Sequence, residues 1–445
     1  MNRIKPHTLS GFMELLPGPQ TQLRAIMKVL RETYSLYGFT PIDTPVIEAA
    51  DVLLAKGGGE TEKQIYRFTK GDSDLALRFD LTVPLAKYVA LHYGQLAFPF
   101  RRYQIGKVYR GERAQRGRFR EFYQADIDVI GDGGLDPANE AEMPAVICEV
   151  FRRLGIERFV IRINNRKVLN GLFDLFGLGG NAAGVMQTID KLEKIGREKV
   201  EHILTTDYGV APESTKGLMD VIESGEPYAL RGRNALLDEG LDELEKVTGL
   251  LGGFGVPDDK WRLDLTIARG LDYYTGTVYE TQLLDYPELG SVCSGGRYDD
   301  LAGYYTDKKL PGVGVSIGVT RLFYVLQEQG LLNDEAVSAP CDALVIPMDE
   351  SVLGYAASVA TQLRAAGVRT QVYLEPKKLK AKFGYADKLS VPFAVVLGSD
   401  EAEKQAVSLK DLTTGSQTVV SADAAARLIL EKTQTAAKPV KEIKQ

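Results

Sequence analysis

Two hydrophobic periodicities alternate along the N-terminal part of the chain. Apolar side chains at helical spacing predict three helices, at residues 23–37, 81–91 and 137–154. Alternation of apolar and polar side chains predicts three strands, at residues 75–79, 103–110 and 119–130. A short basic loop joins the last two strands, so we expect them to pair as a β-hairpin.

The pattern changes twice further along the chain. Residues from about 171 to 259 are mostly helical with glycine-rich breaks, which predicts a helical insertion. A strand-rich pattern returns at residue 261 and runs to a helix near residue 321, so residues 1–330 form the first predicted domain. Residues 331–340 are a predicted linker. Strands then alternate with helices through residues 341–432, which predicts a small α/β domain with a partly parallel sheet. A tail follows at 433–445.

Composition and the absence of certain motifs argue against several classes of protein. The 445 residues have a net charge of -6, which argues against a general nucleic-acid coat protein. Three scattered cysteines and three distant histidines form no CxxC pair and no HExxH motif, which argues against a zinc hydrolase. No apolar run is long enough to span a bilayer and no signal peptide is recognisable, so we expect a cytoplasmic protein without a membrane partner. A P-loop motif is absent.

Charged and polar side chains are most concentrated at residues 107–128. Five arginines occupy positions 110, 113, 116, 118 and 120, and a strand pattern follows them. Alternate side chains of a strand point to opposite faces, so Gln124, Asp126 and Asp128 share one face. Arginines suit a polyanion and carboxylates suit an ammonium group. We therefore expect one site that holds a phosphate compound and an amine together.

Three further segments are rich in polar or glycine residues. Gly312, Gly314, Ser316 and Gly318 leave one strand face bare, which suits either a flat ligand or close packing against a helix. The segment 269–276 carries an arginine and two adjacent tyrosines, which would point to opposite faces if extended. Residues 77–82 place Asp80 and Thr82 on one side.

Together these segments resemble a class II aminoacyl-tRNA synthetase of the histidyl-tRNA synthetase family. Residues 38–45 resemble motif 1, residues 109–128 motif 2, and residues 312–321 motif 3. ARGLDYYTG and SGGRYD resemble the two histidine-specific segments. The resemblance implies an α+β fold, with an antiparallel sheet flanked by helices, a helical insertion and a C-terminal α/β anticodon-binding domain.

The resemblance also implies roles for individual residues. Arg110 and Arg269 are expected to face the α-phosphate as the catalytic arginines. For the rest of ATP it implies Glu112 at the adenine end, Phe122 stacked on the ring and Arg321 at the γ-phosphate. For histidine it implies a larger set, namely Asp80, Thr82, Gln124, Asp128, Arg269, Tyr273, Tyr274 and Tyr298. Tyr274 and Tyr298 are the candidates for the imidazole.

The remaining implications concern partners. Arg113, Arg116 and Arg118 are expected to approach the acceptor end of tRNA(His), and the protein is expected to form a homodimer. Mg²⁺ would accompany ATP without dedicated protein ligands. Two alternatives stay open: a histidine-binding regulatory paralogue of ATP phosphoribosyltransferase, and a tRNA-binding adaptor with an inactive site. The intact arginines favour the ligase over both, and the C-terminal domain also argues against the regulatory paralogue, which usually lacks it.

Overall fold

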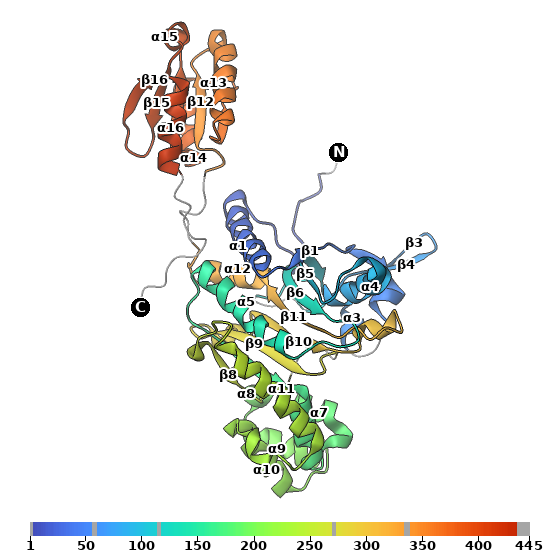
Figure 1. Ribbon diagram of the computed structural model, residues 1–445. Helices are drawn as coiled ribbons and strands as arrows, with labels where there is room; N and C mark the ends of the chain where they lie inside the picture. The colour runs from blue at the N-terminus through green and yellow to red at the C-terminus, as the bar shows by residue number, and fades with distance from the viewer. Residues whose placement is uncertain (1–2, 56–59, 114–116, 269–272, 333–338, 434–445) are drawn as a thin grey trace. The chain divides into compact units, whose positions relative to one another are not determined.

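The chain folds into two compact units. The computed structural model describes residues 3–55, 60–113, 117–268, 273–332 and 339–433 (Figure 1). The larger unit is built mostly from residues 23–332 and the smaller one mostly from residues 333–439. Within the described ranges, no helix is both long enough and apolar enough to cross a membrane.

An eight-stranded sheet forms the centre of the larger unit. Its strands, in spatial order, are β1 (Thr40–Pro41), β5 (Phe100–Tyr109), β6 (Glu121–Ile130), β11 (Gly312–Gly318), β10 (Cys293–Tyr298), β9 (Thr277–Leu283), β7 (Phe159–Asn165) and β8 (Trp261–Leu263). Neighbouring strands are antiparallel except for the two edge pairs, which are parallel. The predicted hairpin is confirmed as β5 and β6, and the predicted antiparallel sheet is confirmed apart from its edges.

Helices and a small second sheet surround the central sheet. Buried side chains of α1 (Pro17–Leu36), α5 (Ala138–Leu154) and α12 (Val319–Glu328) share one core with β6, β7 and β11. In α1 these side chains follow the predicted helical spacing. The remaining elements of this part are α2 (Ala50–Leu53), α3 (Glu60–Gln64), α4 (Thr82–His92), β2 (Ile47–Ala49), β4 (Ser73–Leu77) and β3 (Arg67–Lys70).

The predicted helical insertion is present between β7 and β8. Its helices are α6 (Arg166–Leu175), α7 (Ala182–Ile189), α8 (Leu192–Ile195), α9 (Arg197–Thr206), α10 (Pro212–Ser224) and α11 (Ala235–Leu251). Two glycines let α6 and α11 approach closely, because a Cβ at Gly171 would meet the backbone of Leu237 and one at Gly240 the backbone of Val168. Its apolar side chains continue the core of the larger unit.

The smaller unit has the predicted partly parallel sheet. The strand order is β13 (Thr370–Val372), β12 (Ala343–Pro347), β14 (Phe393–Leu397), β15 (Val407–Asp411) and β16 (Gln417–Val420), with the first three parallel. The helices are α13 (Leu353–Ala365), α14 (Leu379–Lys388), α15 (Ser399–Glu403) and α16 (Ala422–Thr433). The short α15 was not predicted. Strand β13 is an edge strand that ends at Val372, and Leu374 just beyond it is exposed.

Candidate active site

The polar face of β6 lies between two strands that carry complementary groups. Arg102 and Gln104 of β5 stand opposite Asp128 and Asp126. On the other side, Gly314 and Ser316 of β11 stand opposite the same two carboxylates. The predicted grouping of Gln124, Asp126 and Asp128 on one face is therefore placed beside an arginine, an amide, a hydroxyl and bare backbone.

Asp128 has a partner at each oxygen. Nη2 of Arg102 lies 2.5 Å from its Oδ2, and the hydroxyl of Tyr298 donates to its Oδ1 over 2.7 Å. Arg102 is fully buried. Burial raises the pKa of Asp128 to about 6, although Arg102 opposes the shift. The sequence analysis missed Arg102. The register of the predicted hairpin could have identified it, because that register places Arg102 opposite Asp128.

The glycine face of β11 is filled by side chains of neighbouring strands. A Cβ on Gly312 would lie 2.5 Å from the ring of Tyr298, and one on Gly314 would meet the carboxylate of Asp128. On β10, a Cβ at Gly296 would lie 2.9 Å from the ring of Tyr274. Bare backbone lets these side chains lie against the sheet.

Asp80 lies where α4 begins. Its Oδ1 accepts hydrogen bonds from the backbone N–H groups of Thr82 and Val83, over 3.2 and 2.9 Å. Burial raises the pKa of Asp80, while these bonds and the positive charges of Arg110 and Arg102 oppose the shift. We refer to Asp80, Asp126 and Asp128, with Arg102 among them, as the carboxylate cluster.

The two adjacent tyrosines lie differently from the prediction. The rings of Tyr273 and Tyr274 contact each other, with centroids 5.0 Å apart, and Tyr273 also contacts Tyr298 at 6.0 Å. Opposite faces would require an extended backbone, but Tyr273 lies in a turn before β9 begins. The three rings therefore form one aromatic group beside the carboxylate cluster.

A pocket of about 280 Å³ opens next to the cluster. The larger unit lines it with Arg110, Glu112, Gly117, Arg118, Phe119, Phe122, Gln124, Ser291, Val292, Cys293, Ser294, Ser316, Gly318 and Arg321. We call it the arginine pocket. Gln124 connects it to the cluster, since its amide donates to Ser316 over 2.8 Å.

Arg110 is held between two aromatic rings. Its guanidinium carbon lies 4.3 Å from the ring centroid of Phe79 and 5.1 Å from that of Phe122. Its Nε donates to the backbone oxygen of Phe79 over 3.2 Å. Burial lowers the pKa of Arg110, and the nearby charges of Asp80 and Glu112 oppose the shift. The guanidinium remains charged at neutral pH because free arginine titrates far above it.

Arg321 and Arg118 bring further positive charge to the pocket. Nη1 of Arg321 donates to the backbone oxygen of Ser291 over 2.9 Å. Burial lowers the pKa of Arg321, and the charge of Arg118 lowers it further. Arg118 lies 3.8 Å from Glu112, the one carboxylate among the lining residues. Three guanidinium groups against one carboxylate make this pocket suited to a polyanion.

The structure does not place three of the predicted arginines in the pocket. Arg269 and Arg116 are outside the described residues. Arg113 is exposed and does not line the pocket. Arg118, expected at the acceptor end of tRNA, shares the pocket with Arg110 and Arg321.

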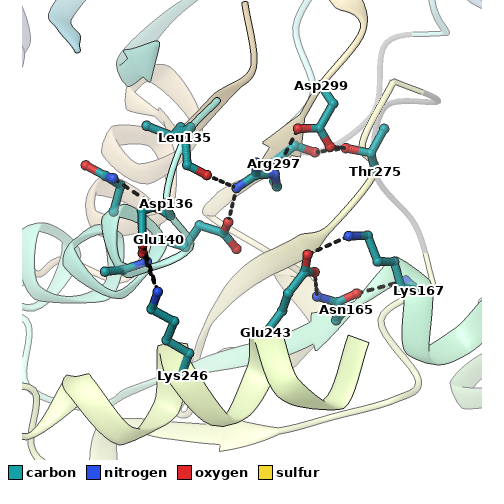
Figure 2. A network of polar contacts seen from close by, with 12 residues as sticks. Leu135, Asp136, Glu140, Asn165, Lys167, Glu243, Lys246, Thr275, Arg297 and Asp299 are labelled. Atoms are coloured by element: carbon teal, nitrogen blue, oxygen red, sulfur yellow. Dashed lines mark hydrogen bonds and ion pairs between the residues drawn. The ribbon is translucent and has the colours of Figure 1, made fainter. Parts of the chain in front are cut away.

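A polar network centred on Arg297, also missed by the sequence analysis, joins Leu135, Glu140 and Asp299 (Figure 2). Arg297 donates to Glu140 over 2.7 Å, to Asp299 over 2.9 Å and to the backbone oxygen of Leu135 over 2.9 Å. The backbone N–H of Thr275, next to Tyr274, donates to the backbone oxygen of Arg297 over 2.8 Å. Because Tyr298 adjoins Arg297, one network anchors the segments that carry both tyrosines.

Comparisons with known proteins agree on one family. The family described as histidyl-tRNA synthetase matches residues 11–322, and an anticodon-binding domain matches residues 342–432. The chain is 50% identical to the histidine–tRNA ligase of Clostridium tetani (strain Massachusetts / E88), covering 96% of this chain and 98% of that protein. It is 47% identical to the enzyme of Xanthomonas campestris pv. campestris (strain 8004), covering 94% and 95%.

Solved structures give a similar result. The crystal structure of histidyl-tRNA synthetase from Nostoc sp. PCC 7120 matches with a TM-score of 0.85 and 41% identity, covering 97% of this chain and 100% of that chain. A protein from Bacillus halodurans C, described as an ATP phosphoribosyltransferase regulatory subunit/histidyl-tRNA synthetase, matches with a TM-score of 0.72 and 22% identity, covering 86% and 97%. At that identity the second likeness shows the fold alone.

Proposed function

The chain belongs to the histidyl-tRNA synthetase family, and we propose that the arginine pocket and the carboxylate cluster are its ATP and histidine sites. The protein is a histidine–tRNA ligase that activates L-histidine with ATP and transfers it to the 3′ end of tRNA(His). The observation that carries the site assignment is the contact between an arginine-lined pocket and a buried acidic cluster. Gln124 and Ser316, which hydrogen-bond each other, join the two.

ATP occupies the arginine pocket in this proposal. The adenine ring stacks on Phe122, with Glu112 near its polar edge. Arg110 faces the α-phosphate and Arg321 the γ-phosphate. The position of Arg110 supports this assignment, because the rings of Phe79 and Phe122 fix its guanidinium. Arg269 is assigned to the α-phosphate and to histidine by family resemblance alone.

Activation then needs no nucleophile from the protein. A carboxylate oxygen of histidine attacks the α-phosphorus, and the bond to the pyrophosphate leaving group breaks. Negative charge grows on the phosphate oxygens, and a fixed guanidinium stabilises that charge in the transition state. In the second step the terminal ribose hydroxyl of tRNA attacks the acyl carbon and AMP leaves.

Histidine lies over the carboxylate cluster in this proposal. Its α-ammonium is near Asp80, Thr82, Gln124 and Asp128, and its imidazole is near Tyr273, Tyr274 and Tyr298. Four of these residues are buried, namely Asp80, Asp128, Tyr273 and Tyr298. Their burial supports discrimination, because a ligand that lacks the matching polar atoms leaves them unpaired.

Mg²⁺ would enter with ATP. The described residues contain no group of three or more His, Cys, Asp or Glu side chains placed to hold a metal ion. That donor set fits a metal ion bound mainly by phosphate oxygens and water, as Mg²⁺ commonly is. When bound, it would neutralise phosphate charge.

The tRNA, the domains and the assembly belong to the same proposal. Residues 1–330 would form the catalytic domain, with 331–340 as linker and 341–432 as the domain that reads the anticodon. Arg113, Arg116 and Arg118 would contact phosphates of the acceptor end. Strand β1, at the exposed edge of the large sheet, supports a homodimer through the motif 1 segment. We place the enzyme in the cytoplasm, where charged tRNA is used.

The regulatory paralogue is less supported than the ligase. Curated relatives at 46–50% identity over nearly the whole chain are histidine–tRNA ligases. The likeness to the Bacillus halodurans protein carries the fold only.

Histidine-dependent ATP–pyrophosphate exchange tests the proposed function directly. We expect exchange with histidine and background rates with the other nineteen amino acids. Histidine binding without exchange would overturn the assignment of the arginine pocket and favour the regulatory paralogue. Binding of tRNA(His) without exchange and without charging would favour the adaptor with an inactive site instead.

A further inference from the structure

Asp126 occupies the middle of the polar face of β6 and has no assigned role so far. It is 3% exposed, between Gln124 and Asp128 on the same face. Ser316 hydrogen-bonds its carboxylate, and the same serine accepts a hydrogen bond from the Gln124 amide. Its Oδ1 is buried and has no hydrogen-bond partner among the described residues.

The neighbouring acceptors differ in how far they are already used. Oδ1 of Asp128 accepts a hydrogen bond from Tyr298, and Oδ1 of Asp80 accepts two at the start of α4. Oδ2 of Asp128 accepts no hydrogen bond from the described residues, but it lies 2.5 Å from Arg102 in an ion pair. Oε1 of Gln124, in contrast, is buried without a partner within the described part of the chain. The face of β6 therefore offers two free acceptors, one on Gln124 and one on Asp126. A buried acceptor without a donor is costly unless a ligand or water supplies one.

Charged and titratable groups surround Asp126 on every packed element. Strand β6 contributes Asp128, β5 contributes Arg102, and the segment before α4 contributes Arg78 and Asp80. From other elements come Arg110, Tyr34, Tyr274 and Cys293. Within the cluster, three carboxylates share the guanidinium of Arg102, while Arg78 and Arg110 add positive charge from outside it. Desolvation, with Asp128 and Asp80 adding to it, raises the pKa of Asp126 to about 7, against the effect of Arg102.

We propose that Asp126 is a further histidine-binding residue, whose free Oδ1 accepts a hydrogen bond from the substrate α-ammonium together with Oε1 of Gln124. Asp128, already paired with Arg102 and Tyr298, then positions Tyr298 for the imidazole. This proposal rests on the proposed histidine site. An ammonium group brings three N–H donors and one positive charge, which matches the two free acceptors and the excess of negative charge.

Binding should also displace a proton. In the free protein near pH 7, the carboxyl of Asp126 is partly protonated, since its pKa is about 7. The ammonium favours the ionised carboxylate, so the proton leaves to solvent as histidine binds. The affinity for histidine should therefore increase between pH 6 and pH 8 more in the wild type than in a variant that cannot titrate at this position.

A bound water is the competing explanation. Nε and Nη1 of Arg102 also lack partners among the described residues, so a water could join them to Oδ1 of Asp126. Asp126 would then be structural. Its replacement would weaken the binding of histidine no more than the binding of a ligand that lacks the ammonium group.

The test compares two ligands in two proteins. Dissociation constants are measured by calorimetry for histidine and for 3-(imidazol-4-yl)propionate, which lacks the ammonium. We expect Asp126→Asn to weaken histidine binding about 10- to 100-fold and the propionate less than about 3-fold, as for loss of one charged hydrogen bond. Asp132→Asn, the same change at an exposed carboxylate just beyond β6, is the matched control and should change neither.

The outcomes separate this proposal from the proposed function. Equal effects on both ligands, or no effect on either, would overturn the role of Asp126. A wild-type protein that does not bind histidine would instead overturn the histidine site itself. ATP binding and the melting temperature report whether the Asn variant is folded. If it is not, Asp126→Ser is measured in the same way.

Discussion

The arginine pocket and the carboxylate cluster adjoin each other, but their charged side chains have different kinds of partner. In the pocket, Arg110 and Arg321 donate to backbone oxygens. In the cluster, Asp128 is neutralised by Arg102 and bonded by Tyr298. The first arrangement keeps positive charge available for a polyanion. The second builds an acidic site of limited net charge, suited to one small cation.

This difference predicts which substitutions should reduce activity and which should reduce stability. Removing a pocket arginine takes away charge that the fold does not need, so activity should fall while stability stays. Removing the buried arginine of the cluster leaves carboxylates without their cation, so stability should fall first. The variants below test that separation, from the largest expected effect to the smallest.

Arg102→Met should give the largest loss of stability. It leaves Asp128 buried without its ion-pair partner, which typically costs about 3–5 kcal/mol of the free energy of unfolding. Urea unfolding at pH 8, followed by tyrosine fluorescence, measures the change. Arg67→Met, which removes an exposed ion pair to Asp74, should have little effect. If Arg102→Met unfolded at the same urea midpoint as the wild type, the ion pair between Arg102 and Asp128 would be dispensable for stability.

Arg110→Ala should give the largest loss of activity. We expect histidine-dependent ATP–pyrophosphate exchange to fall by about 100- to 1000-fold, the typical cost of removing one fixed donor to a developing charge. The melting temperature should change little, since the side-chain contacts that Arg110 makes with the described residues are stacking on Phe79 and Phe122 and one hydrogen bond to the backbone oxygen of Phe79. Arg67→Ala is the control. Exchange within a few-fold of wild type would exclude Arg110 from the α-phosphate.

Asp126→Asn should stabilise the unliganded protein in a pH-dependent way. In the wild type, the pKa of Asp126 is raised from about 3.8 to about 7, so the folded state favours the protonated carboxyl. This contribution to the stability of the wild type is lost as pH rises through 7. The neutral amide avoids that loss. We expect a gain on the order of 2 kcal/mol at pH 8 and almost none at pH 4. A gain that is the same at both pH values would contradict the raised pKa.

Tyr298→Phe should give the smallest of the four effects and should act on one substrate. Loss of its hydrogen bond to Asp128 leaves that carboxylate less well oriented, so KM for histidine should increase about 10-fold. KM for ATP should stay within about 2-fold. Tyr93→Phe, which removes a hydroxyl that donates to the exposed Asp132 over 2.7 Å, is the matched control. Equal changes in both KM values would mean that the pocket and the cluster are not separable.

Local sequence patterns predicted most of the elements that build this site. The hairpin of β5 and β6, the bare strand β11 and the helical insertion all follow from periodicity and glycine placement, which are local properties. Family resemblance supplied the roles of Arg110, Phe122 and Arg321, and the structure brings these three residues to one pocket. The expectation that Tyr273 and Tyr274 point to opposite faces applied to an extended backbone, but the chain turns at Tyr273 and the two rings contact each other.

The amino-acid sequence by itself determined which side chains share a face of a strand, because that depends only on the two-residue repeat of the backbone. Gln124, Asp126 and Asp128 were grouped in this way. Only the tertiary structure decided that Arg102 pairs with Asp128, that Tyr298 lies on Gly312, and that Asp126 keeps a free oxygen. These contacts depend on strand register and burial. Both arise from packing between segments far apart in the sequence.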